Sequence, residues 1–457
     1  MDSTEFTWYK RRWLVLFSVC VLNISNAANT FSYISLLEGA KTVYQVDHTY
    51  VVTVALVMQA LPILSGIPSI FIIDAVGLRS SIWLGGLMNA VGSIGKAIST
   101  LPIFKSAAFT NSVVGDVIIA LAKPFICFIP TYVSSAWFPT RERPIATALG
   151  SLSYLIGIIF TKIFLWNPPY PDRRAADITK LNNIWCGISV ASFLIALVAV
   201  RSSRPPSPPS DTGRAVVPLS IKSIVKSFAN KSLSTISLCV ACQLAFFIYL
   251  VIDLELVLCL RGYEWSMNLI TLLGFLISGI VASCSAGILV AKNKDVNHVR
   301  KLLVGAMCIS ISFLPLTMLT ERYTFGITII CIIIGLVGFP AFTLGLHLSD
   351  ECSYTFLPEY ASMGVILLLS QVFIIVYRGI FEGLSKPILH VNASNCPTNA
   401  LVYKPYDLTN PFLCIAGLQA LSSILFIVFF ETDFKRSRIE MVARLQRILN
   451  IRRSVEI

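Results

Sequence analysis

The sequence predicts an all-α membrane protein with twelve transmembrane helices in two six-helix bundles. Hydrophobic residues make up 55% of the 457-residue chain and charged residues only 13%. Apolar segments of about 20 residues, the length that crosses the hydrocarbon core of a bilayer, recur along nearly the whole chain. One polar, proline-rich segment divides them into six before it and six after it.

The apolar segments follow one another closely and leave no room for a large soluble domain. The first is longer than the hydrophobic part of a secretory signal peptide, and no small-residue cleavage site follows it, so we expect it to be retained as the first span. The predicted spans cover residues 13–37, 50–74, 81–101, 109–133, 144–165, 182–200, 233–259, 266–291, 299–319, 324–347, 361–384 and 411–431.

The net charge of +12 is placed as in a membrane protein and not as in a nucleic-acid-binding protein. With the N-terminus in the cytoplasm, most Lys and Arg residues fall in the predicted cytoplasmic loops and in the two termini. This is the positive-inside bias of membrane proteins. We therefore expect both termini in the cytoplasm, basic surfaces that meet anionic lipid headgroups, and no nucleic-acid partner.

The sequence predicts four parts. Residues 1–200 form an N-terminal six-helix bundle, and residues 201–232 form a cytoplasmic linker that begins RSSRPPSPPS and continues into a short amphipathic surface helix. Residues 233–431 form a C-terminal six-helix bundle, and residues 432–457 form a basic cytoplasmic tail.

Metal and cofactor chemistry is not indicated. Most of the 12 cysteines lie inside spans, where they behave as small hydrophobic residues, and the one C-x-x-C spacing, Cys239 to Cys242, also falls inside an apolar span. The four histidines are scattered. We expect no cofactor and no metal ion. Asn392 begins an Asn-Ala-Ser sequence in the long outer loop before the last span and is a candidate glycosylation site.

Two short polar stretches predict a conformational latch at the cytoplasmic ends of the spans. Asp74, Gly77 and Arg79 lie where the second span ends and the third begins, so that a carboxylate, a turn glycine and an arginine meet between two helices. The stretch resembles the signature loop of the major facilitator superfamily, in which the latch stabilises one conformation. The alternative is an ordinary tight turn. Residues 141–143 join spans four and five, and we assign the same role to Arg141, Glu142 and Arg143.

The chain resembles the feline leukemia virus subgroup C receptor-related transporters, solute carrier family 49 of the major facilitator superfamily. The residues that carry the resemblance are Tyr9–Trp13, Trp137–Arg143 with Ala146–Ala148, Glu351–Tyr354, the proline-rich linker and Leu22–Ala27. The last of these favours the branch of the domain-containing protein seven type. The resemblance implies the major facilitator fold and small organic solutes, with choline and ethanolamine, heme or pyridoxine as family substrates.

The resemblance also implies site residues. Gln371 matches the span-eleven glutamine of the members that bind cations, but the aromatic cage residue of span one falls on Thr30 and the span-five glutamine falls near Leu155. Both differences weaken a choline assignment, because a quaternary ammonium needs aromatic faces. Tyr33 and Tyr154 supply some aromatic surface.

Lys123 lies near the middle of an apolar span, where it replaces a family glutamine. An ammonium at that depth is costly unless it faces water or a partner, so we expect it to line a cavity, where it would repel cations and favour an anion or zwitterion. A water-bridged pair with Asp116, seven residues earlier on the same face, is the expected contact. An interhelical anchor bonded to carbonyls is the alternative.

Polar residues in two other spans complete the predicted pocket. Asn23, Asn26, Thr30 and Tyr33 share one face of span one, and either line a wet cavity or pack against another helix. Glu255, in the outer part of span seven, matches a polar family position, and we expect it to point inward. The alternative is that this span ends earlier and that Glu255 lies in water.

The sequence therefore predicts a secondary-active or facilitative transporter that moves a small polar or zwitterionic organic solute by alternating access, as uniport or coupled to protons. A non-transporting receptor or scaffold is the alternative. An enzyme is not expected, because the spans contain no catalytic set of residues at one depth. We expect a monomer whose partners are the solute and the lipid bilayer, in the plasma membrane rather than in endolysosomes.

Overall fold

The computed structural model describes residues 9–32, 43–164, 174–210, 217–260, 265–292, 324–354, 356–387, 406–407 and 409–430, together with residues 436, 439 and 442. For a few of these residues, among them 252–260, the description covers the backbone but not the side chain.

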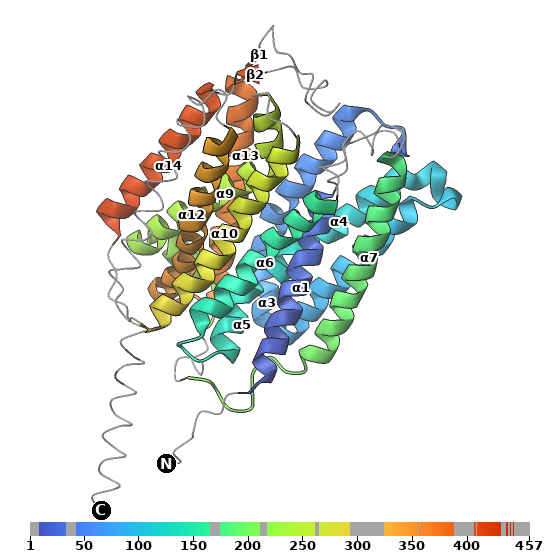
Figure 1. The fold of residues 1–457 in the computed structure, drawn as a ribbon. Coiled ribbons are helices and arrows are strands. Elements are labelled where there is room, and N and C mark those ends of the chain that lie inside the picture. Colours follow the sequence, from blue (N-terminus) through green and yellow to red (C-terminus); the bar gives the residue numbers. More distant parts are fainter. Residues whose placement is uncertain are drawn as a thin grey trace, which may run out of the picture.

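Helices before the linker form one group and helices after it form another (Figure 1). The first group contains α1 (Arg11–Phe31), α3 (His48–Ser99), η2 (Pro102–Ala107), α4 (Ala108–Cys127), α5 (Ile129–Trp137), α6 (Arg143–Phe164) and α7 (Arg174–Ala199). The short helix α8 (Ile221–Ala229) follows the linker. The second group contains α9 (Lys231–Leu260), α10 (Trp265–Lys292), α12 (Thr324–Ser353), α13 (Glu359–Leu384) and α14 (Thr409–Phe429). We call the two groups the N-half and the C-half.

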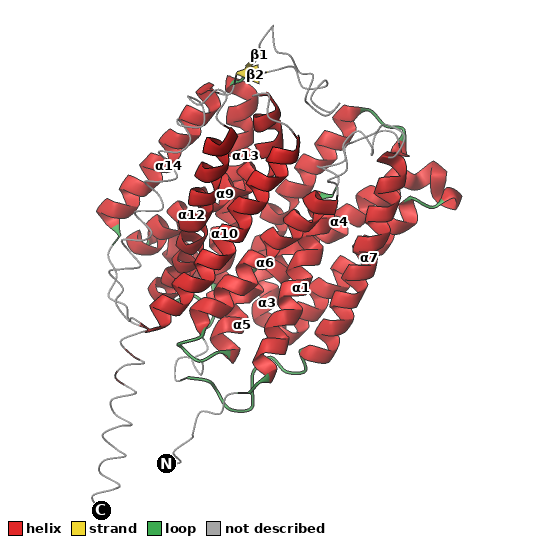
Figure 2. Ribbon diagram, viewed as in Figure 1, coloured by secondary structure: helices red, strands yellow, loops and turns green. Residues whose placement is uncertain are grey.

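Almost all of the described chain is helical, as Figure 2 shows. Two-residue strands β1 (Lys386–Pro387) and β2 (Tyr406–Asp407) pair antiparallel before α14. Within the described residues, ten helical segments are long and apolar enough to cross a membrane. One of them contains two predicted spans, and the predicted span 299–319 lies outside the described residues. The prediction of an all-α membrane fold is confirmed, whereas the count of twelve spans stays a prediction.

The 52-residue helix α3 is broken at Gly77, which has φ +75° and ψ 173°. This left-handed conformation strains any residue with a Cβ atom, so a glycine is required where the chain turns back. The break falls between the predicted spans 50–74 and 81–101. The turn predicted from Asp74, Gly77 and Arg79 is therefore the point at which one span ends and the next begins.

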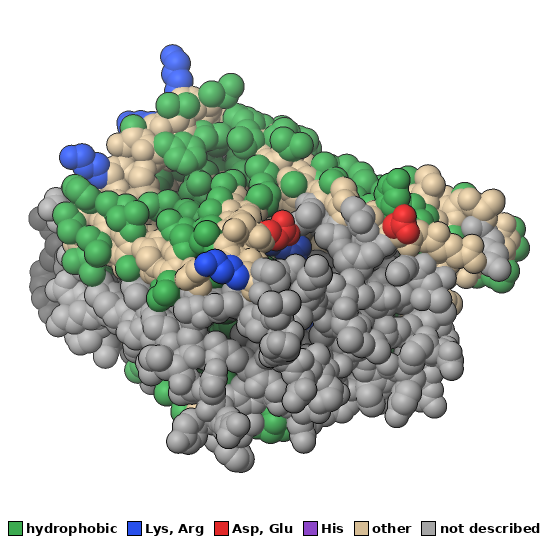
Figure 3. All heavy atoms as spheres, turned by 90° about the horizontal axis from the view of Figure 1, so that it is seen from above, with side chains coloured by type: hydrophobic (Ala, Val, Ile, Leu, Met, Phe, Trp, Pro, Cys, Tyr) green, Lys and Arg blue, Asp and Glu red, His purple; other side chains and the backbone are tan. Residues whose placement is uncertain are grey.

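Large apolar side chains lie exposed along the outer faces of both halves. Leu64 is 76% exposed, Val198 63% and Val281 59%. Figure 3, which looks onto the end that carries β1 and β2, shows mainly hydrophobic side chains and few charged ones on the described surface. An apolar surface of this kind is stable in contact with lipid tails, so the fold agrees with a protein embedded in a bilayer.

The proline-rich linker runs along the end of the molecule where the chain begins (Figure 1). We call this end the linker end and define it by residues 201–210. Arg11 donates to the carbonyl oxygen of Ala199 at 3.0 Å, and the backbone N–H of Arg79 donates to Ser203 Oγ at 3.1 Å. The predicted surface helix is α8, where Ile221, Val225 and Phe228 are exposed on one stripe.

Candidate functional site

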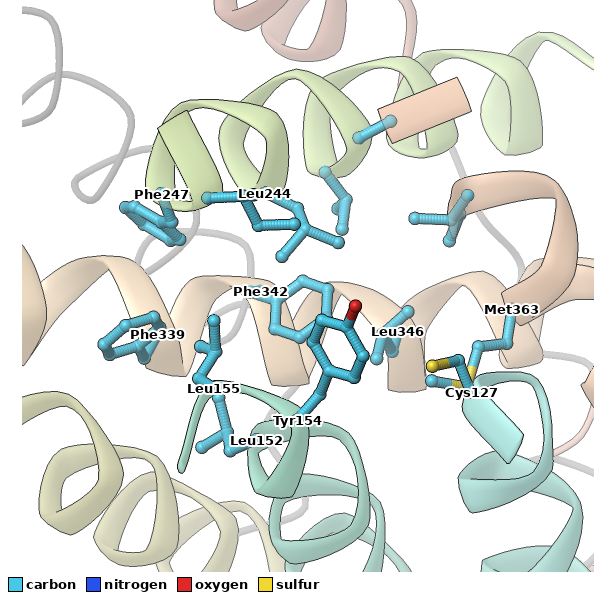
Figure 4. Close-up of a cluster of buried hydrophobic side chains, with 14 of the residues drawn as sticks. Cys127, Leu152, Tyr154, Leu155, Leu244, Phe247, Phe339, Phe342, Leu346 and Met363 are labelled. Atoms are coloured by element: carbon cyan, nitrogen blue, oxygen red, sulfur yellow. The ribbon is translucent and has the colours of Figure 1, made fainter. Parts of the chain in front are cut away.

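A cavity of about 50 Å³ lies between the two halves, large enough for a few water molecules. Helices α1, α3, α4, α5 and α6 form its walls on the N-half, and α9, α12 and α13 form them on the C-half. Figure 4 shows apolar side chains from both halves meeting around Tyr154. The lining residues are Asn23, Pro62, Lys123, Pro124, Cys127, Phe128, Pro130, Ser151, Tyr154, Leu155, Leu244, Ile248, Phe342, Met363, Leu367, Leu368 and Gln371.

Lys123 is the one charged side chain among these lining residues. It is 9% exposed, and its Nζ atom lies 5.2 Å from the centroid of the Tyr154 ring. An ammonium over an aromatic face gains a cation–π attraction. Within the described part of the chain, we find no hydrogen bond or ion pair to this ammonium. The alternative for Lys123, an interhelical anchor bonded to carbonyl oxygens, is therefore not found among the described residues.

Four further polar side chains face the same cavity, and one of them, Ser151, donates to the carbonyl oxygen of Thr147 at 2.7 Å. Asn23 donates through Nδ2 to the carbonyl oxygen of Gly150 at 3.2 Å, which leaves its Oδ1 atom without a partner. The Tyr154 hydroxyl is buried and has no hydrogen bond, and Figure 4 shows it pointing away from α6. Gln371, on α13, is the polar side chain that the C-half contributes to the lining. The polar groups thus come mainly from the N-half, opposite a largely apolar wall.

The polar face of α1 divides between the cavity and the interior of the N-half. Asn23 borders the cavity, whereas Asn26 is fully buried and donates to Asn89 Oδ1 at 3.0 Å and to the carbonyl oxygen of Ile119 at 3.1 Å. Thr30 donates to the carbonyl oxygen of Asn26 at 2.8 Å and is not among the lining residues. Asn26 therefore joins α1 to α3 and α4, which is the packing alternative for this residue.

A second buried lysine, Lys96, which sequence analysis did not single out, pairs with Asp116, the carboxylate expected to pair with Lys123. Lys96 Nζ lies 2.8 Å from Asp116 Oδ1, donates to the carbonyl oxygen of Asn29 at 2.8 Å and donates to Ser32 Oγ at 3.2 Å. The expected Lys123–Asp116 contact is therefore corrected to a direct Lys96–Asp116 ion pair. The pair forms because the rotation of α4 against α3 points Asp116 at Lys96.

The rotation of α4 is fixed by glycines that let the two helices touch. A Cβ atom on Gly115 would lie 2.6 Å from the carbonyl oxygen of Gly92 and 3.0 Å from Lys96 Cγ. The two helix backbones can approach this closely only because Gly92 and Gly115 carry no side chain at the point of contact. The glycines at 92, 95 and 115 were the signal in the sequence that these two spans approach closely enough for an ion pair.

Residues of both halves meet at the linker end. The Tyr360 hydroxyl, on α13, donates to Asp74 Oδ1, on α3. Thr131 Oγ1 donates to the carbonyl oxygen of Glu359 at 3.2 Å, and the rings of Tyr132 and Tyr360 lie 5.0 Å apart. These three contacts join α3 and α5 of the N-half to the beginning of α13.

The predicted latch residues thus have partners that spacing in the sequence did not reveal. No ion pair joins Asp74 to Arg79 among the described contacts. Asp74 bonds to the C-half, while the Arg79 guanidinium stacks 4.0 Å from the centroid of the Trp83 ring. Tyr360 could not be found from the loop sequence, since it lies 286 residues away.

The stretch between α5 and α6 is held to the N-terminus and to the linker. Glu142 forms an ion pair with Arg12 at 2.9 Å. Arg143 is 3% exposed and donates to the carbonyl oxygen of Phe138 at 3.3 Å and to Ser210 Oγ at 2.5 Å. Arg141 is exposed. The three contacts with measured distances lie within the N-half and its linker and stabilise that half.

Three predicted residues fall outside this description. Tyr33 and Asn392 are not among the described residues, and the side chain of Glu255 lies in the part of α9 for which only the backbone is described. Among the described residues, no group of three or more His, Cys, Asp or Glu side chains is placed to hold a metal ion.

Comparison with known proteins finds relatives along almost the whole chain. Solute carrier family 49 member A3 of Xenopus tropicalis is 27% identical over 441 residues, which cover 95% of this chain and 90% of the relative. The Danio rerio protein of the same name is 25% identical over 96% of this chain and 91% of its own length. The choline/ethanolamine transporter FLVCR2 of Rattus norvegicus is 22% identical over 94% of this chain and 76% of its own length. No family model matches the sequence.

Solved structures place the fold among major facilitator superfamily transporters. The transporter FucP in its outward conformation aligns with a TM-score of 0.62 at 14% identity, over 93% of this chain and all of FucP. The proton:xylose symporter XylE aligns with a TM-score of 0.65 at 9% identity, over 92% of this chain and 96% of XylE. The expectation that the chain is not an enzyme agrees with the transporter names of these proteins.

Proposed function

We propose that this chain, which belongs to the part of the major facilitator superfamily related to solute carrier family 49, moves a small polar or zwitterionic organic solute across the membrane by alternating access. The observation that carries the proposal is the cavity between the halves, in which Lys123, Asn23 and Gln371 meet a largely apolar wall. A site with a few polar groups in apolar surroundings near the midplane of two packed bundles is typical of secondary transporters.

The contacts at the linker end support a gating role. The hydrogen bond from Tyr360 to Asp74 and the contact from Thr131 to the Glu359 carbonyl must break before the cavity opens on that side. Each is a single hydrogen bond, and such bonds contribute about 1 kcal/mol net. A gate of a few bonds this weak can be opened by the free energy of solute binding.

The proposed orientation places the linker end, and with it both termini, in the cytoplasm. Arg11, Arg12, Arg79 and Arg143 have contacts at or next to the linker end, in agreement with the positive-inside bias. We propose that the protein lies in the plasma membrane as a monomer. Its transport is either uniport or coupled to protons.

The names of the relatives supply the first solutes to test. Choline and ethanolamine come from the FLVCR2 name, and heme and pyridoxine come from the resemblance to the wider family. Thr30 stands where that resemblance places an aromatic cage residue, and Lys123 lies in the cavity. Both features disfavour a quaternary ammonium, so zwitterionic and neutral polar solutes belong in the same panel.

Uptake into liposomes that contain the purified full chain tests the proposal. We expect uptake of at least one labelled solute among choline, ethanolamine, pyridoxine, heme and amino-acid-like compounds, above the level of protein-free liposomes. An imposed pH gradient then distinguishes coupled transport from uniport. Protein that is folded, as judged by gel filtration, but moves none of these solutes would contradict the proposed substrate class, and the receptor or scaffold alternative would replace it.

A further inference from the structure

We propose that the solute is an organic monoanion, with a carboxylate bound by Lys123 and a compact apolar body held against the C-half. This inference rests on the proposed function, because it names the substrate class of the same cavity. It departs from the cationic solutes named for the choline/ethanolamine relatives.

The charge inside the cavity is the first argument. Lys123 is 9% exposed, and among the residues that line the cavity no Asp or Glu is present. The carboxylate on the same helix, Asp116, is already paired with Lys96 at 2.8 Å. A buried ammonium without a counterion is unfavourable, and the lining of this cavity holds no negative charge that balances Lys123. An anionic solute supplies it.

The hydrogen-bonding groups beside Lys123 are the second argument. The Tyr154 ring lies 5.2 Å from the ammonium, and the Tyr154 hydroxyl is buried without a hydrogen bond. The ammonium and the phenol line the same cavity, and both can donate hydrogen bonds. Donors grouped in this way bind a carboxylate, which has two acceptor oxygens and no donor.

The opposite wall is the third argument. Leu244, Ile248, Phe342, Leu367 and Leu368 come from α9, α12 and α13 and offer no charged group to a solute. Figure 4 shows Leu244 and Phe342 across from Tyr154. An apolar body gains free energy from burial against such a wall. A solute with one carboxylate can pair with Lys123, whereas a second carboxylate on the same solute would have no cation to pair with.

A cation is disfavoured by the same geometry. An ammonium group on the solute would meet Lys123 without any lining carboxylate to offset the repulsion. A zwitterion satisfies Lys123, but its own ammonium would meet no carboxylate in the lining and only the uncharged amides of Asn23 and Gln371. The monoanion is the class in which every charge has a partner.

Binding of matched ligands to the full chain in nanodiscs tests the inference. Each series keeps one carbon skeleton and changes the head group: isovalerate, isovaleramide and isopentylammonium in one, and phenylacetate, phenylacetamide and phenethylammonium in the other. We expect the carboxylate of at least one series to bind at least about tenfold more tightly than its amide and its amine, by calorimetry or thermal shift.

Variants at position 123 separate the charge from the fold. We expect Lys123→Gln to lose about tenfold or more in carboxylate affinity and to leave amide affinity nearly unchanged, whereas Lys123→Arg keeps the preference for the anion. Lys222→Gln, which removes an exposed lysine on α8, is the matched control and should change neither. If Lys123→Gln does not fold, the comparison of Lys123→Arg with wild-type protein over the same two series still tests the anion preference.

The outcomes distinguish the inference from the proposed function. Amide or amine binding as tight as carboxylate binding, carboxylate binding that Lys123→Gln leaves unchanged, or no carboxylate binding below about 10 mM would each overturn the inference. Choline uptake into liposomes, with no inhibition by either carboxylate, would also overturn it while leaving the transport function intact. Tight carboxylate binding without uptake of any tested solute would instead contradict the transport function and support the anion site.

Discussion

Two lysines buried in the N-half differ in what surrounds them. Lys96 is 1% exposed and bonds to Asp116, to the Asn29 carbonyl and to Ser32 Oγ. Lys123 is 9% exposed and has an aromatic ring as its nearest described partner. The same side chain is thus fully satisfied between helices in one place and unsatisfied beside a cavity in the other. The comparison teaches that a charge inside a membrane protein marks a functional site when its partners are missing.

The largest expected effect comes from removing the partner of Lys96. Asp116→Asn leaves a buried ammonium without its counterion, and we expect a loss of about 3–5 kcal/mol in the free energy of unfolding. Lys123→Met is the matched test on the other lysine. It should leave stability unchanged or raise it, because it removes a buried charge that has no described counterion. Thermal unfolding in one detergent measures both, and equal losses would remove the distinction between the two lysines.

A smaller effect is expected from the glycine contact that positions the ion pair. Gly115→Ala places a methyl group 2.6 Å from the Gly92 carbonyl oxygen, so α3 and α4 must move apart. We expect a loss of about 1–3 kcal/mol. Gly187→Ala is the control on α7, since nothing lies within 4 Å of the added Cβ atom, and it should be neutral or slightly stabilising. If both substitutions behave alike, close helix contact does not set the position of Asp116.

The contacts at the linker end differ from both lysines, because they are satisfied in this structure and the proposed transport cycle requires them to break. Tyr360→Phe removes the hydrogen bond to Asp74. We expect the free energy that holds the linker-end contacts closed to fall by about 1–2 kcal/mol. The rate of amide hydrogen exchange in α5 and in the first turn of α13 should then rise about tenfold, whereas the rate in α7 should not change. Unchanged exchange in all three helices would show that this bond does not hold the linker end closed.

The smallest effect is expected at a partly exposed pair. Glu142 is 30% exposed and Arg12 11% exposed in the pair that they form at 2.9 Å. Because water screens such a contact, Glu142→Gln should cost at most about 1 kcal/mol. Thermal unfolding in the same detergent as for Asp116→Asn places the two pairs on one scale. A loss as large as that of Asp116→Asn would mean that burial does not govern the strength of these pairs.

Sequence reasoning predicted the features that depend on composition and local pattern. The apolar segments gave the membrane fold, Gly77 marked the turn inside α3, and the isolation of Lys123 in an apolar run pointed to a residue that lines the cavity. Gln371, named from the family resemblance, and Tyr154, named for its aromatic ring, also line it. These features can be predicted because each depends on the sequence pattern within a single helix.

The features that escaped prediction depend on how helices are rotated against each other. Lys96 lies near the end of its predicted span, where a lysine side chain ordinarily reaches toward the membrane surface, so its position alone does not predict a buried ion pair. Asp116 was assigned to Lys123 because both share a face of one helix, whereas its true partner lies on α3. The pattern on α1 allows either a cavity face or packing against another helix, and Asn26 is fully buried and bonded to residues of α3 and α4. Sequence spacing fixes positions along a helix and not the neighbour that each side meets.

Cysteine labelling tests most directly whether the space between the halves opens to water. Cys127 lines the cavity and is 8% exposed, and Cys331, on α12, is 2% exposed and does not line it. The full chain in nanodiscs would be treated with a small maleimide for increasing times, and the modified peptides identified by mass spectrometry. The account predicts that Cys127 is modified several-fold faster than Cys331 and that a bound solute slows Cys127 alone. Equal, slow modification of both cysteines would contradict it.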